Sequence, residues 1–394
     1  MNTMNRLKPI FWVLSLLLFL SGGTLVSAKL KAPFKVKINY KTPIEKLEFH
    51  DTIAGVYSQL HNEIKQMNIG ARNPSFNGTV LVAHKGKLIF EASYGVSNRA
   101  IGLRNTPKTP TQIASITKTF TGTSILWLEQ RGFLNIKDPV QKYIWEFPYA
   151  DITIQHLLSH RSGLPEYLKF STRYWTSSAP MYNEELLAMF RNKKMRLDFQ
   201  PGTSFSYCNS NFAMLALLIE RITKMPYKQF VSQYIFEPLN MQNSFVYDPM
   251  DTYNFSFAKS YKANFSDFNN TFQDGVYGDK GIFTTVEDLY RWDRALYKNE
   301  FLAEEFKQNA FTPTRDWSVE KNYGLGWRIK CYPNGEKYVY HTGWWHGYQG
   351  IFARYIKDDF TIIILSNRYI SGISKNSEEI YKVAQQYLGL TELS

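Results

Sequence analysis

The residues Ser115-Ile-Thr-Lys-Thr-Phe-Thr-Gly-Thr-Ser-Ile-Leu-Trp-Leu-Glu-Gln130 begin the helical centre of this chain. Their apolar members recur at helical spacing: Ile116, Phe120, Ile125 and Leu128. Gly132 follows as a stop signal, so the pattern predicts a helix over this segment. In such a helix Ser115 and Lys118 lie one turn apart on the same face. A hydroxyl beside an amine suits a serine nucleophile that is activated by a neighbouring base.

Strand patterns lie on both sides of this helical centre. On the N-terminal side, Thr79-Val-Leu-Val-Ala83 and Lys87-Leu-Ile-Phe90 flank the turn His84-Lys-Gly86, which predicts a β-hairpin. On the C-terminal side, further strand patterns and a last helix follow at residues 337–340, 350–356, 360–365 and 377–388. Because strands lie near both ends and helices between them, the sequence predicts an α+β fold. We expect one antiparallel sheet, built from both chain ends and flanked by helices, with a mainly helical region inserted.

The length and composition are sufficient for a large folded domain. The chain has 394 residues, of which 44% are hydrophobic and 20% charged, and this composition predicts a globular protein. The domain is expected to span residues 51–390. Its sheet region is expected at about residues 51–114 and 285–390, and its helical region at about residues 115–284.

The N-terminal segment has the pattern of an export signal. Arg6 and Lys8 precede an apolar run from Ile10 to Leu20, and Val26-Ser27-Ala28 ends it with small residues. Residues 1–28 are therefore interpreted as a signal peptide that is cleaved after Ala28. The protein would then be secreted across the inner membrane into the periplasm or cell envelope. An uncleaved N-terminal anchor is the alternative, because the apolar run approaches the length that spans a membrane.

The charge of the chain is strongly positive, at +12. For a cytoplasmic protein this value would make nucleic acid a candidate partner. For an exported protein we expect no nucleic acid, and anionic envelope surfaces become the candidates. Residues 29–50 form a lysine-rich leader, which either contacts such a surface or serves as a tether without a partner.

The two cysteines, Cys208 and Cys331, do not form a disulfide framework. Because Cys208 lies between Tyr207 and Asn209, a bridge there would encumber those side chains. We interpret both cysteines as small buried residues. A pairing in an oxidising compartment stays open.

Two short strings follow Ser115-Ile-Thr-Lys118 along the chain, namely Tyr207-Cys-Asn209 and His341-Thr-Gly343. In this order the three strings resemble the serine β-lactamase-like and penicillin-binding family. Within that family they resemble the branch of class C β-lactamases, D-Ala-D-Ala carboxypeptidases and related esterases. Flanking segments share the resemblance: His156-Leu-Leu-Ser-His-Arg-Ser-Gly-Leu-Pro165, Phe236-Glu-Pro-Leu-Asn-Met241, Gly281-Ile-Phe-Thr-Thr-Val-Glu-Asp-Leu289 and Tyr323-Gly-Leu-Gly-Trp327. The resemblance covers about residues 50–390.

The resemblance implies a role for each residue of the first two strings. Ser115 is expected to attack a carbonyl, form an acyl-enzyme and release the acyl group to water. Lys118 and Tyr207 are the two candidate bases, and the sequence leaves the choice between them open. Asn209 is expected to hydrogen-bond Lys118 and the substrate amide, because a carboxamide both donates and accepts hydrogen bonds.

The third string is expected to line the substrate site. His341 occupies a position that many relatives fill with lysine, and its implied role is to assist proton transfer to the leaving group or to hold Tyr207. The backbone N–H groups of Ser115 and Trp344 are expected to form an oxyanion hole. The expected substrate-binding residues are Asn209, His341, Thr342, Gly343 and Trp344. No cofactor or metal is expected.

A histidine pair offers a competing metal hypothesis. His156 and His160 are four residues apart, which is a zinc-ligand spacing. No glutamate follows His156 as it does in a His-Glu-x-x-His motif. The family resemblance already accounts for this segment, so we assign it no metal.

Departures from the family pattern bear on the substrate. Tyr207-Cys-Asn209 stands where class A β-lactamases have Ser-Asp-Asn, and His341 removes a fixed positive charge that is expected in class C β-lactamases. Where several carboxylate-binding relatives have a hydroxyl after the glycine, this chain has Trp344 and Trp345. Two indoles favour an apolar or bulky substrate group.

These observations predict an exported serine hydrolase of the β-lactamase-related, carboxypeptidase or esterase type. It would cleave an ester or amide through an acyl-serine intermediate, with D-amino-acyl or peptide groups of the cell envelope as favoured substrates. A β-lactamase is the first alternative. The second alternative is a non-catalytic protein that binds β-lactams or wall fragments as a sensor.

Overall fold

The computed structural model describes residues 54–66, 76–316 and 320–393. The chain divides into two units, Met1–Lys35 and Val36–Ser394, and every described residue belongs to the second. The predicted signal peptide and basic leader lie outside the described residues. Within the described part, no helix combines the length and the apolar character needed to cross a bilayer.

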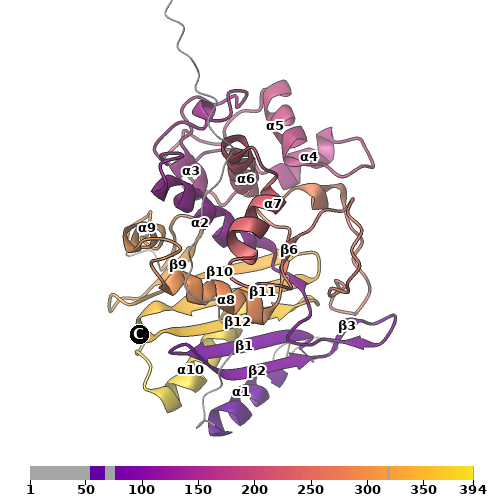
Figure 1. Ribbon diagram of the computed structural model, residues 1–394, viewed down its shortest axis with the longest axis vertical. Helices are drawn as coiled ribbons and strands as arrows, with labels where there is room; N and C mark the ends of the chain where they lie inside the picture. Colours follow the sequence, from indigo (N-terminus) through magenta and orange to yellow (C-terminus); the bar gives the residue numbers. More distant parts are fainter. Residues whose placement is uncertain (1–53, 67–75, 317–319, 394) are drawn as a thin grey trace, which may run out of the picture. The chain divides into compact units, whose positions relative to one another are not determined.

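An antiparallel sheet forms the centre of the fold. Among the described residues it has seven strands, in the order β2-β1-β12-β11-β10-β9-β8. They are β1 (Gly78–His84), β2 (Lys87–Tyr94), β8 (Lys321–Tyr323), β9 (Arg328–Cys331), β10 (Lys337–Trp345), β11 (Tyr348–Tyr355) and β12 (Phe360–Ser366). β1 pairs with β12 along its whole length, so strands from the two sides of the helical centre lie next to each other (Figure 1). The predicted sheet built from both chain ends is therefore confirmed.

Helices α1 (Ala54–Gln66) and α10 (Ile373–Leu388) cover one face of this sheet (Figure 1). Successive side chains of a strand point to opposite faces, so alternate strand residues meet the two helices. The resulting core is fully buried and includes Val56, Leu60, Ile64, Val80, Val82, Ile351, Ile362, Ile364 and Ile380. α10 begins a few residues before its predicted start.

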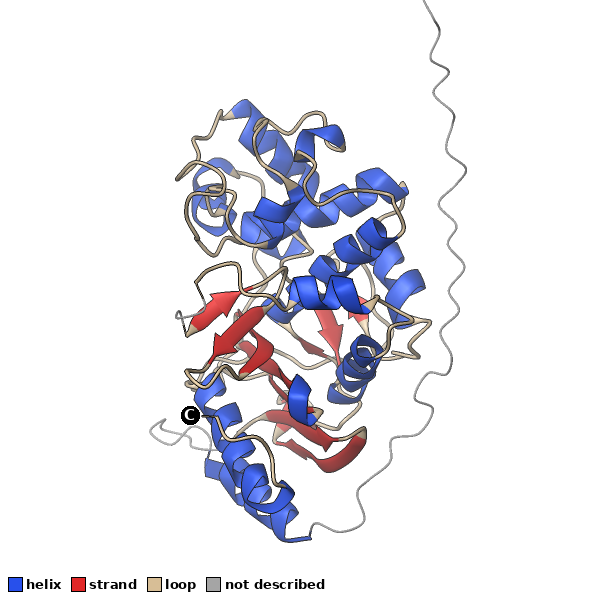
Figure 2. Ribbon diagram, turned by 90° about the vertical axis from the view of Figure 1, so that its left-hand side faces the viewer, coloured by secondary structure: helices blue, strands red, loops and turns tan. Residues whose placement is uncertain are grey.

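The opposite face carries α8 (Val286–Tyr297), which packs on β1 and β12. Thr285 directly precedes α8, and its hydroxyl accepts a hydrogen bond from the backbone N–H of Asp288 at 3.1 Å and so caps the helix. Figure 2 shows the sheet between two groups of helices. The α+β architecture predicted from the sequence is thus confirmed.

The helical centre is built around α2 (Thr117–Gln130), in which every residue from Thr117 to Leu128 is buried. α6 (Asn209–Thr223) packs against α2, and the other helices of this region surround the pair. They are α3 (Ile154–Leu158), α4 (Tyr167–Tyr174), α5 (Asn183–Asn192) and α7 (Tyr227–Val231). The predicted helix at residues 115–130 begins as a 3₁₀ turn, η1 (Ala114–Ile116), and continues as α2.

In the described part of the chain, two small sheets lie outside the central one. β3 (Val96–Asn98) pairs with β4 (Leu103–Arg104), and β7 (Ile282–Thr284) lies between β5 (Thr111–Gln112) and β6 (Phe245–Val246). The pairing of β5 with β7 matters for the site. It places the segment just before β7 beside the turn that carries Ser115.

Both cysteines are buried and free, and no disulfide joins them. The Cys208 thiol donates to the carbonyl of Leu164 at 3.2 Å. Burial raises the pKa of Cys208 to about 12, so the thiol stays protonated at neutral pH. The interpretation of both cysteines as small buried residues is confirmed.

A buried carboxylate joins α8 to the sheet. Asp293 is fully buried, and its oxygens accept from Arg354 Nε at 2.5 Å, Arg294 Nη2 at 2.6 Å and Thr361 Oγ1 at 3.0 Å. Burial alone would raise the pKa of Asp293, but the two arginines hold it below its ordinary value. The Arg354 side chain also lines a cavity of about 350 Å³ between α8, α9 (Glu304–Ala310) and the sheet.

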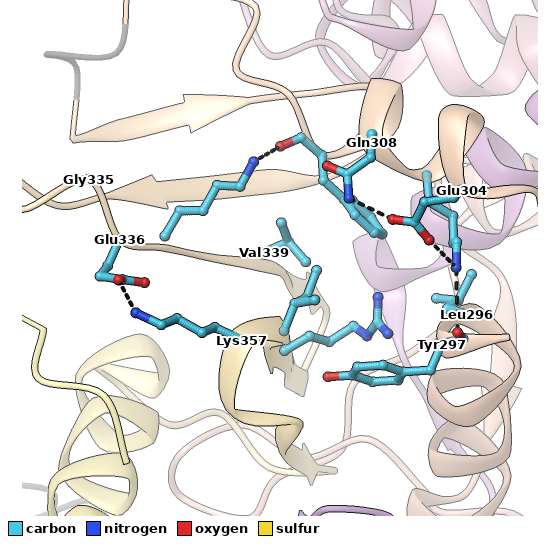
Figure 3. A pocket seen from close by; sticks show the side chains of 13 residues that line it. Leu296, Tyr297, Glu304, Gln308, Gly335, Glu336, Val339 and Lys357 are labelled. Carbon is cyan, nitrogen blue, oxygen red and sulfur yellow. Dashed lines mark hydrogen bonds and ion pairs between the residues drawn. The ribbon is translucent and has the colours of Figure 1, made fainter. Parts of the chain in front are cut away.

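Ion pairs surround this cavity. Figure 3 shows Lys357 paired with Glu336 on one side and Glu304 hydrogen-bonded to Gln308 on the other. The hydroxyl of Tyr297 points toward the middle of the cavity (Figure 3). Lys307 on α9 adds an ion pair with Glu304 at 2.9 Å and lies 3.5 Å from the carbonyl of Tyr297, so a polar contact links α9 to the end of α8.

Replacing Asp293 by alanine is expected to lower the free energy of unfolding by about 3–5 kcal/mol, because it leaves the buried Arg354 without its counter-ion. Equilibrium urea unfolding measures this loss. Asp359→Asn is the control, because Asp359 also pairs with Arg294 but is one-third exposed. Its expected cost is about 0–1 kcal/mol. If both variants lost the same free energy of unfolding, Asp293 would not be the counter-ion that stabilises the buried Arg354.

Candidate active site

Ser115 and Lys118 meet as the sequence predicts. Lys118 Nζ lies 3.0 Å from Ser115 Oγ, across the junction of η1 and α2. Ala114, directly before the serine, has a positive φ of 47°, which is rare for a residue with a side chain. Such backbone strain is concentrated at functional sites, where the surrounding structure maintains it. Ser115 is half-buried and lies in the middle of η1, two residues before α2.

Lys118 is fully buried, and its amine contacts two further oxygens among the described residues. These are Asn209 Oδ1 and the backbone carbonyl of Asp279, both at 2.8 Å. Both oxygens can only accept hydrogen bonds, whereas the Ser115 hydroxyl can donate or accept. A neutral Lys118 amine would donate to the two fixed acceptors and direct its lone pair at the Ser115 hydroxyl.

Glu166 fixes the orientation of Asn209. Its carboxylate Oε2 accepts from the backbone N–H of Asn209 at 2.8 Å and from Asn209 Nδ2 at 3.0 Å. Because a carboxylate only accepts, the amide nitrogen of Asn209 must face Glu166 and the amide oxygen must face Lys118. Burial raises the pKa of Glu166, and the backbone N–H bonds oppose that rise.

Tyr207 lies two residues before the start of α6, with its ring between three side chains. Its ring centroid is 4.3 Å from the ring of His160, 5.1 Å from Lys118 Nζ and 4.7 Å from the guanidinium carbon of Arg328. The Tyr207 hydroxyl is buried and has no hydrogen-bond partner among the described residues. An unpartnered buried hydroxyl is costly and points to a function.

Both ring nitrogens of the fully buried His341 are engaged. Nδ1 lies 2.7 Å from the carbonyl of Thr342, which only accepts, so Nδ1 carries the hydrogen. Nε2 lies 3.1 Å from the Tyr323 hydroxyl and therefore accepts from it. Burial, followed by the charges of Arg328 and Lys118, lowers the pKa of His341 well below 6.5. The structure thus places a neutral His341 against Tyr323. The ring centroids of His341 and Tyr207 are 6.2 Å apart, and no hydrogen bond joins the Tyr207 hydroxyl to His341.

Gly343 allows β10 to lie directly against the nucleophile turn. A β-carbon at this position would lie 2.1 Å from the carbonyl oxygen of Ile113 and 3.2 Å from Ala114 Cβ. Only glycine permits so close an approach. The next residue, Trp344, is 66% exposed, and its backbone follows the strand past Ser115.

The structure brings the three predicted strings together, and it adds residues that the sequence analysis missed: Glu166, Asp279, Tyr323 and Arg328. Glu166 directly follows the segment that ends at Pro165, and Tyr323 opens the segment that ends at Trp327. Their positions beside family motifs were the available signal. Asp279 contributes its backbone carbonyl. Because every residue type has such a carbonyl, the sequence could not indicate this role.

The histidines of the metal hypothesis have structural partners. His156 Nδ1 accepts from the backbone N–H of Thr153 at 3.3 Å and so closes the start of α3. His160 Nδ1 accepts from the backbone N–H of Cys208 at 3.2 Å and lies 3.1 Å from Asn211 Nδ2. His160 thereby supports the loop that carries Tyr207.

Comparisons with known proteins agree with this geometry. A family model described as Beta-lactamase matches residues 69–383. Penicillin-binding protein 4* of Bacillus subtilis is 32% identical over 325 residues, which are 77% of this chain and 72% of that protein. A crystal structure of a penicillin-binding protein from Bacillus halodurans superimposes with a TM-score of 0.72 and 27% identity, covering 82% of this chain and 98% of that one.

A more distant structure shares the fold alone. D-amino acid amidase from Ochrobactrum anthropi has a TM-score of 0.70 at 20% identity, and the match covers 83% of this chain and 99% of that chain. The family model covers well over half of the chain, and the Bacillus subtilis relative supports the same assignment. The chain therefore belongs to the beta-lactamase family.

Proposed function

We propose that the protein is an exported serine hydrolase that cleaves an ester or amide bond through an acyl group on Ser115. The favoured substrates are D-amino-acyl or peptide groups of the cell envelope. One observation carries this proposal: Lys118 Nζ lies 3.0 Å from Ser115 Oγ, and two oxygens that only accept hydrogen bonds hold it there.

In the proposed reaction, the Lys118 amine takes the hydroxyl proton of Ser115 as Oγ bonds to the carbonyl carbon of the substrate. The backbone N–H groups of Ser115 and Trp344 stabilise the oxygen anion that forms. The bond to the leaving group then breaks, the leaving group takes the proton, and the acyl group stays on Ser115. Water attacks that ester as Lys118 takes one of its protons. Lys118 then gives this proton to Ser115 Oγ as the ester bond breaks, and the acid product leaves with Ser115 and Lys118 restored.

Tyr207 and His341 have different roles in this proposal. The unpartnered Tyr207 hydroxyl lies in the same buried cluster as Lys118, which supports a role in passing the proton to the leaving group. His341 has no free nitrogen for that transfer. We therefore propose that His341 holds Tyr323 and strand β10 in position.

Arg328 supports a substrate with a negative charge. Its guanidinium lies over the Tyr207 ring, and no carboxylate pairs with it among the described residues. Its Nε is buried and lacks a hydrogen-bond partner there. Arg328 thus supplies the fixed positive charge that His341 cannot, and a substrate carboxylate would satisfy it. The name of the Bacillus subtilis relative, a penicillin-binding protein, supports the same choice, because penicillins carry a carboxylate.

Replacing Arg328 by methionine is expected to lower kcat/KM for a peptide that ends in a free carboxylate by about 10–100-fold, which corresponds to one charge-assisted hydrogen bond. The same variant is expected to hydrolyse a neutral p-nitrophenyl ester at nearly the parent rate. Steady-state kinetics on the two substrates give the comparison. An equal loss on both would show that Arg328 supports Tyr207 instead of binding substrate.

The proposed function is tested by incubating the purified protein with a penicillin and, separately, with a p-nitrophenyl ester. Intact mass and peptide mapping locate any acyl group, and Ser115→Ala is the control. An adduct on Ser115, together with ester hydrolysis that Ser115→Ala abolishes, supports the proposal. Ester hydrolysis that survives Ser115→Ala would overturn it.

The same experiment separates the two alternatives. Rapid destruction of the penicillin without a lasting adduct would identify a β-lactamase. Binding of penicillin or wall peptides that survives Ser115→Ala, with no turnover of any acyl substrate, would identify a binding or sensor protein.

A further inference from the structure

A second buried lysine lies beside the proposed catalytic lysine and has no role in the reaction described above. Lys280 directly follows Asp279, whose carbonyl accepts from Lys118, and its side chain is 4% exposed. Burying an ammonium group is costly unless specific partners compensate for its lost hydration. The partners of Lys280 therefore indicate what the residue does.

The first partners hold the end of its side chain. Lys280 Nζ donates to the Tyr167 hydroxyl at 2.5 Å and to the carbonyl of Val276 at 3.1 Å. Tyr167 in turn donates its hydroxyl hydrogen to Asp279 Oδ2 at 2.9 Å. Asp279 and Lys280 are thus joined both through their peptide bond and through Tyr167. That peptide bond contains the carbonyl that accepts from Lys118, so its orientation depends on both side chains.

The next partner lies on the opposite wall of the site. Lys280 Nζ is 4.9 Å from the ring centroid of Trp345, a distance at which a cation and an indole attract each other. Trp345 is held further by its Nε1, which donates to Asp274 Oδ1 at 2.6 Å. It directly follows Trp344, whose backbone N–H is a proposed oxyanion donor.

Charged groups surround Lys280 on several elements. Asp279 is its neighbour in the chain, Asp274 lies in η4 (Phe272–Gly275), and Glu166 precedes α4. Lys118 on α2 opposes them with a like charge. Burial lowers the pKa of Lys280, and Asp279 and Asp274 oppose that change. His346 contacts Asp274 at 3.2 Å.

We propose that Lys280 is a positioning residue that joins the two halves of the active site. Through the Asp279 peptide it holds the carbonyl that orients Lys118. Through the Trp345 ring it holds the end of β10 that carries the Trp344 N–H. This inference rests on the proposed function. Among the described residues, Lys280 Nζ donates to Tyr167 and Val276 and not to Ser115, so the task assigned to it is an indirect one.

Lys280→Met tests the assignment, because methionine has a similar length and lacks the charge. The expected result is a fall in kcat for a p-nitrophenyl ester of about 10–100-fold, since small displacements of catalytic groups have effects of this size. KM is expected to stay within about threefold, because no contact to substrate is lost. Near-UV circular dichroism is expected to change in the tryptophan region, because the cation leaves the face of Trp345.

The matched control is Lys307→Met. Lys307 is also buried, at 4% exposure, and it lies on α9 beside the cavity of Figure 3. Its replacement is expected to lower the thermal midpoint and leave kcat within about twofold. An effect of Lys280→Met on stability alone, with kcat and the near-UV spectrum like those of the parent, would overturn the assignment.

A second pair of variants tests the link to β10 if Lys280→Met does not fold. Trp345 is partly exposed, so its replacement is less disruptive. Trp345→Leu removes the aromatic face and is expected to lower kcat. Trp345→Phe retains an aromatic face, so its kcat is expected to be higher than that of Trp345→Leu. Equal kcat values for the parent and Trp345→Leu would overturn the link. If the parent itself does not hydrolyse the ester or acylate Ser115, the proposed function fails and the Lys280 assignment fails with it.

Discussion

Lys118→Met is expected to lower the rate of Ser115 acylation by about 10⁴-fold or more, the scale on which removal of a catalytic base acts. Methionine retains the length of the buried side chain and removes the amine that lies 3.0 Å from Ser115 Oγ. The two fixed acceptors, Asn209 Oδ1 and the Asp279 carbonyl, lose their donor as well. Stopped-flow measurement of acylation by an activated ester gives the rate without interference from product release.

Tyr207→Phe is the companion variant, and it separates the two candidate bases. The Tyr207 hydroxyl has no partner among the described residues, so its removal leaves no other group unsatisfied. We expect a loss of about 10²-fold, as for a group that assists proton transfer. If Tyr207→Phe loses more than Lys118→Met, the phenol is the base and the assignment of Lys118 is wrong. Thermal unfolding of both variants shows whether either loss reflects misfolding.

Gly343→Ala is expected to lower kcat by about 10²–10³-fold, the usual effect of losing an oxyanion donor. The added methyl group would lie 2.1 Å from the carbonyl oxygen of Ile113, far inside van der Waals contact. β10 must then move away from the nucleophile turn, and the Trp344 N–H moves with it. Steady-state kinetics on an activated ester measure the loss.

Gly55→Ala is the control for this substitution. Gly55 lies in α1, and among the described residues its added methyl group would meet only a Tyr387 ring atom, at 3.5 Å, which is ordinary contact. Alanine is favoured over glycine in a helix by about 1 kcal/mol, so this variant is expected to be as active as the parent and slightly more stable. Retained activity in Gly343→Ala would contradict the proposed oxyanion hole.

Most of the fold follows from local patterns. The hairpin of β1 and β2 was predicted from two apolar runs on either side of the turn His84-Lys-Gly86, and the strands after residue 337 from similar runs. The helical spacing after Ser115 predicted α2, apart from its first turn. That turn is 3₁₀ and contains Ala114 with a positive φ, and a strained residue of this kind has no signature in the sequence.

The candidate site was predictable to the extent that it consists of short strings. Ser115, Lys118, Tyr207, Asn209 and His341 belong to three motifs, and the structure brings the motifs together. The partners of these residues were less accessible to sequence analysis. Asn209 lies 91 residues from Lys118, and Asp279 lies 161 residues from it. No periodicity or spacing rule relates residues at such distances.

The sequence by itself therefore determined the type of chemistry, because a serine and a lysine one helical turn apart are adjacent wherever the helix lies. Only the tertiary structure decided how each group can act. In the folded chain, Lys118 contacts two oxygens that only accept hydrogen bonds. Both ring nitrogens of His341 are hydrogen-bonded, one to Tyr323 and one to Thr342. Arg328 has no carboxylate partner among the described residues. The physical reason is that protonation and hydrogen bonding depend on the atoms that surround a buried group, and in this fold those atoms come from distant segments of the chain.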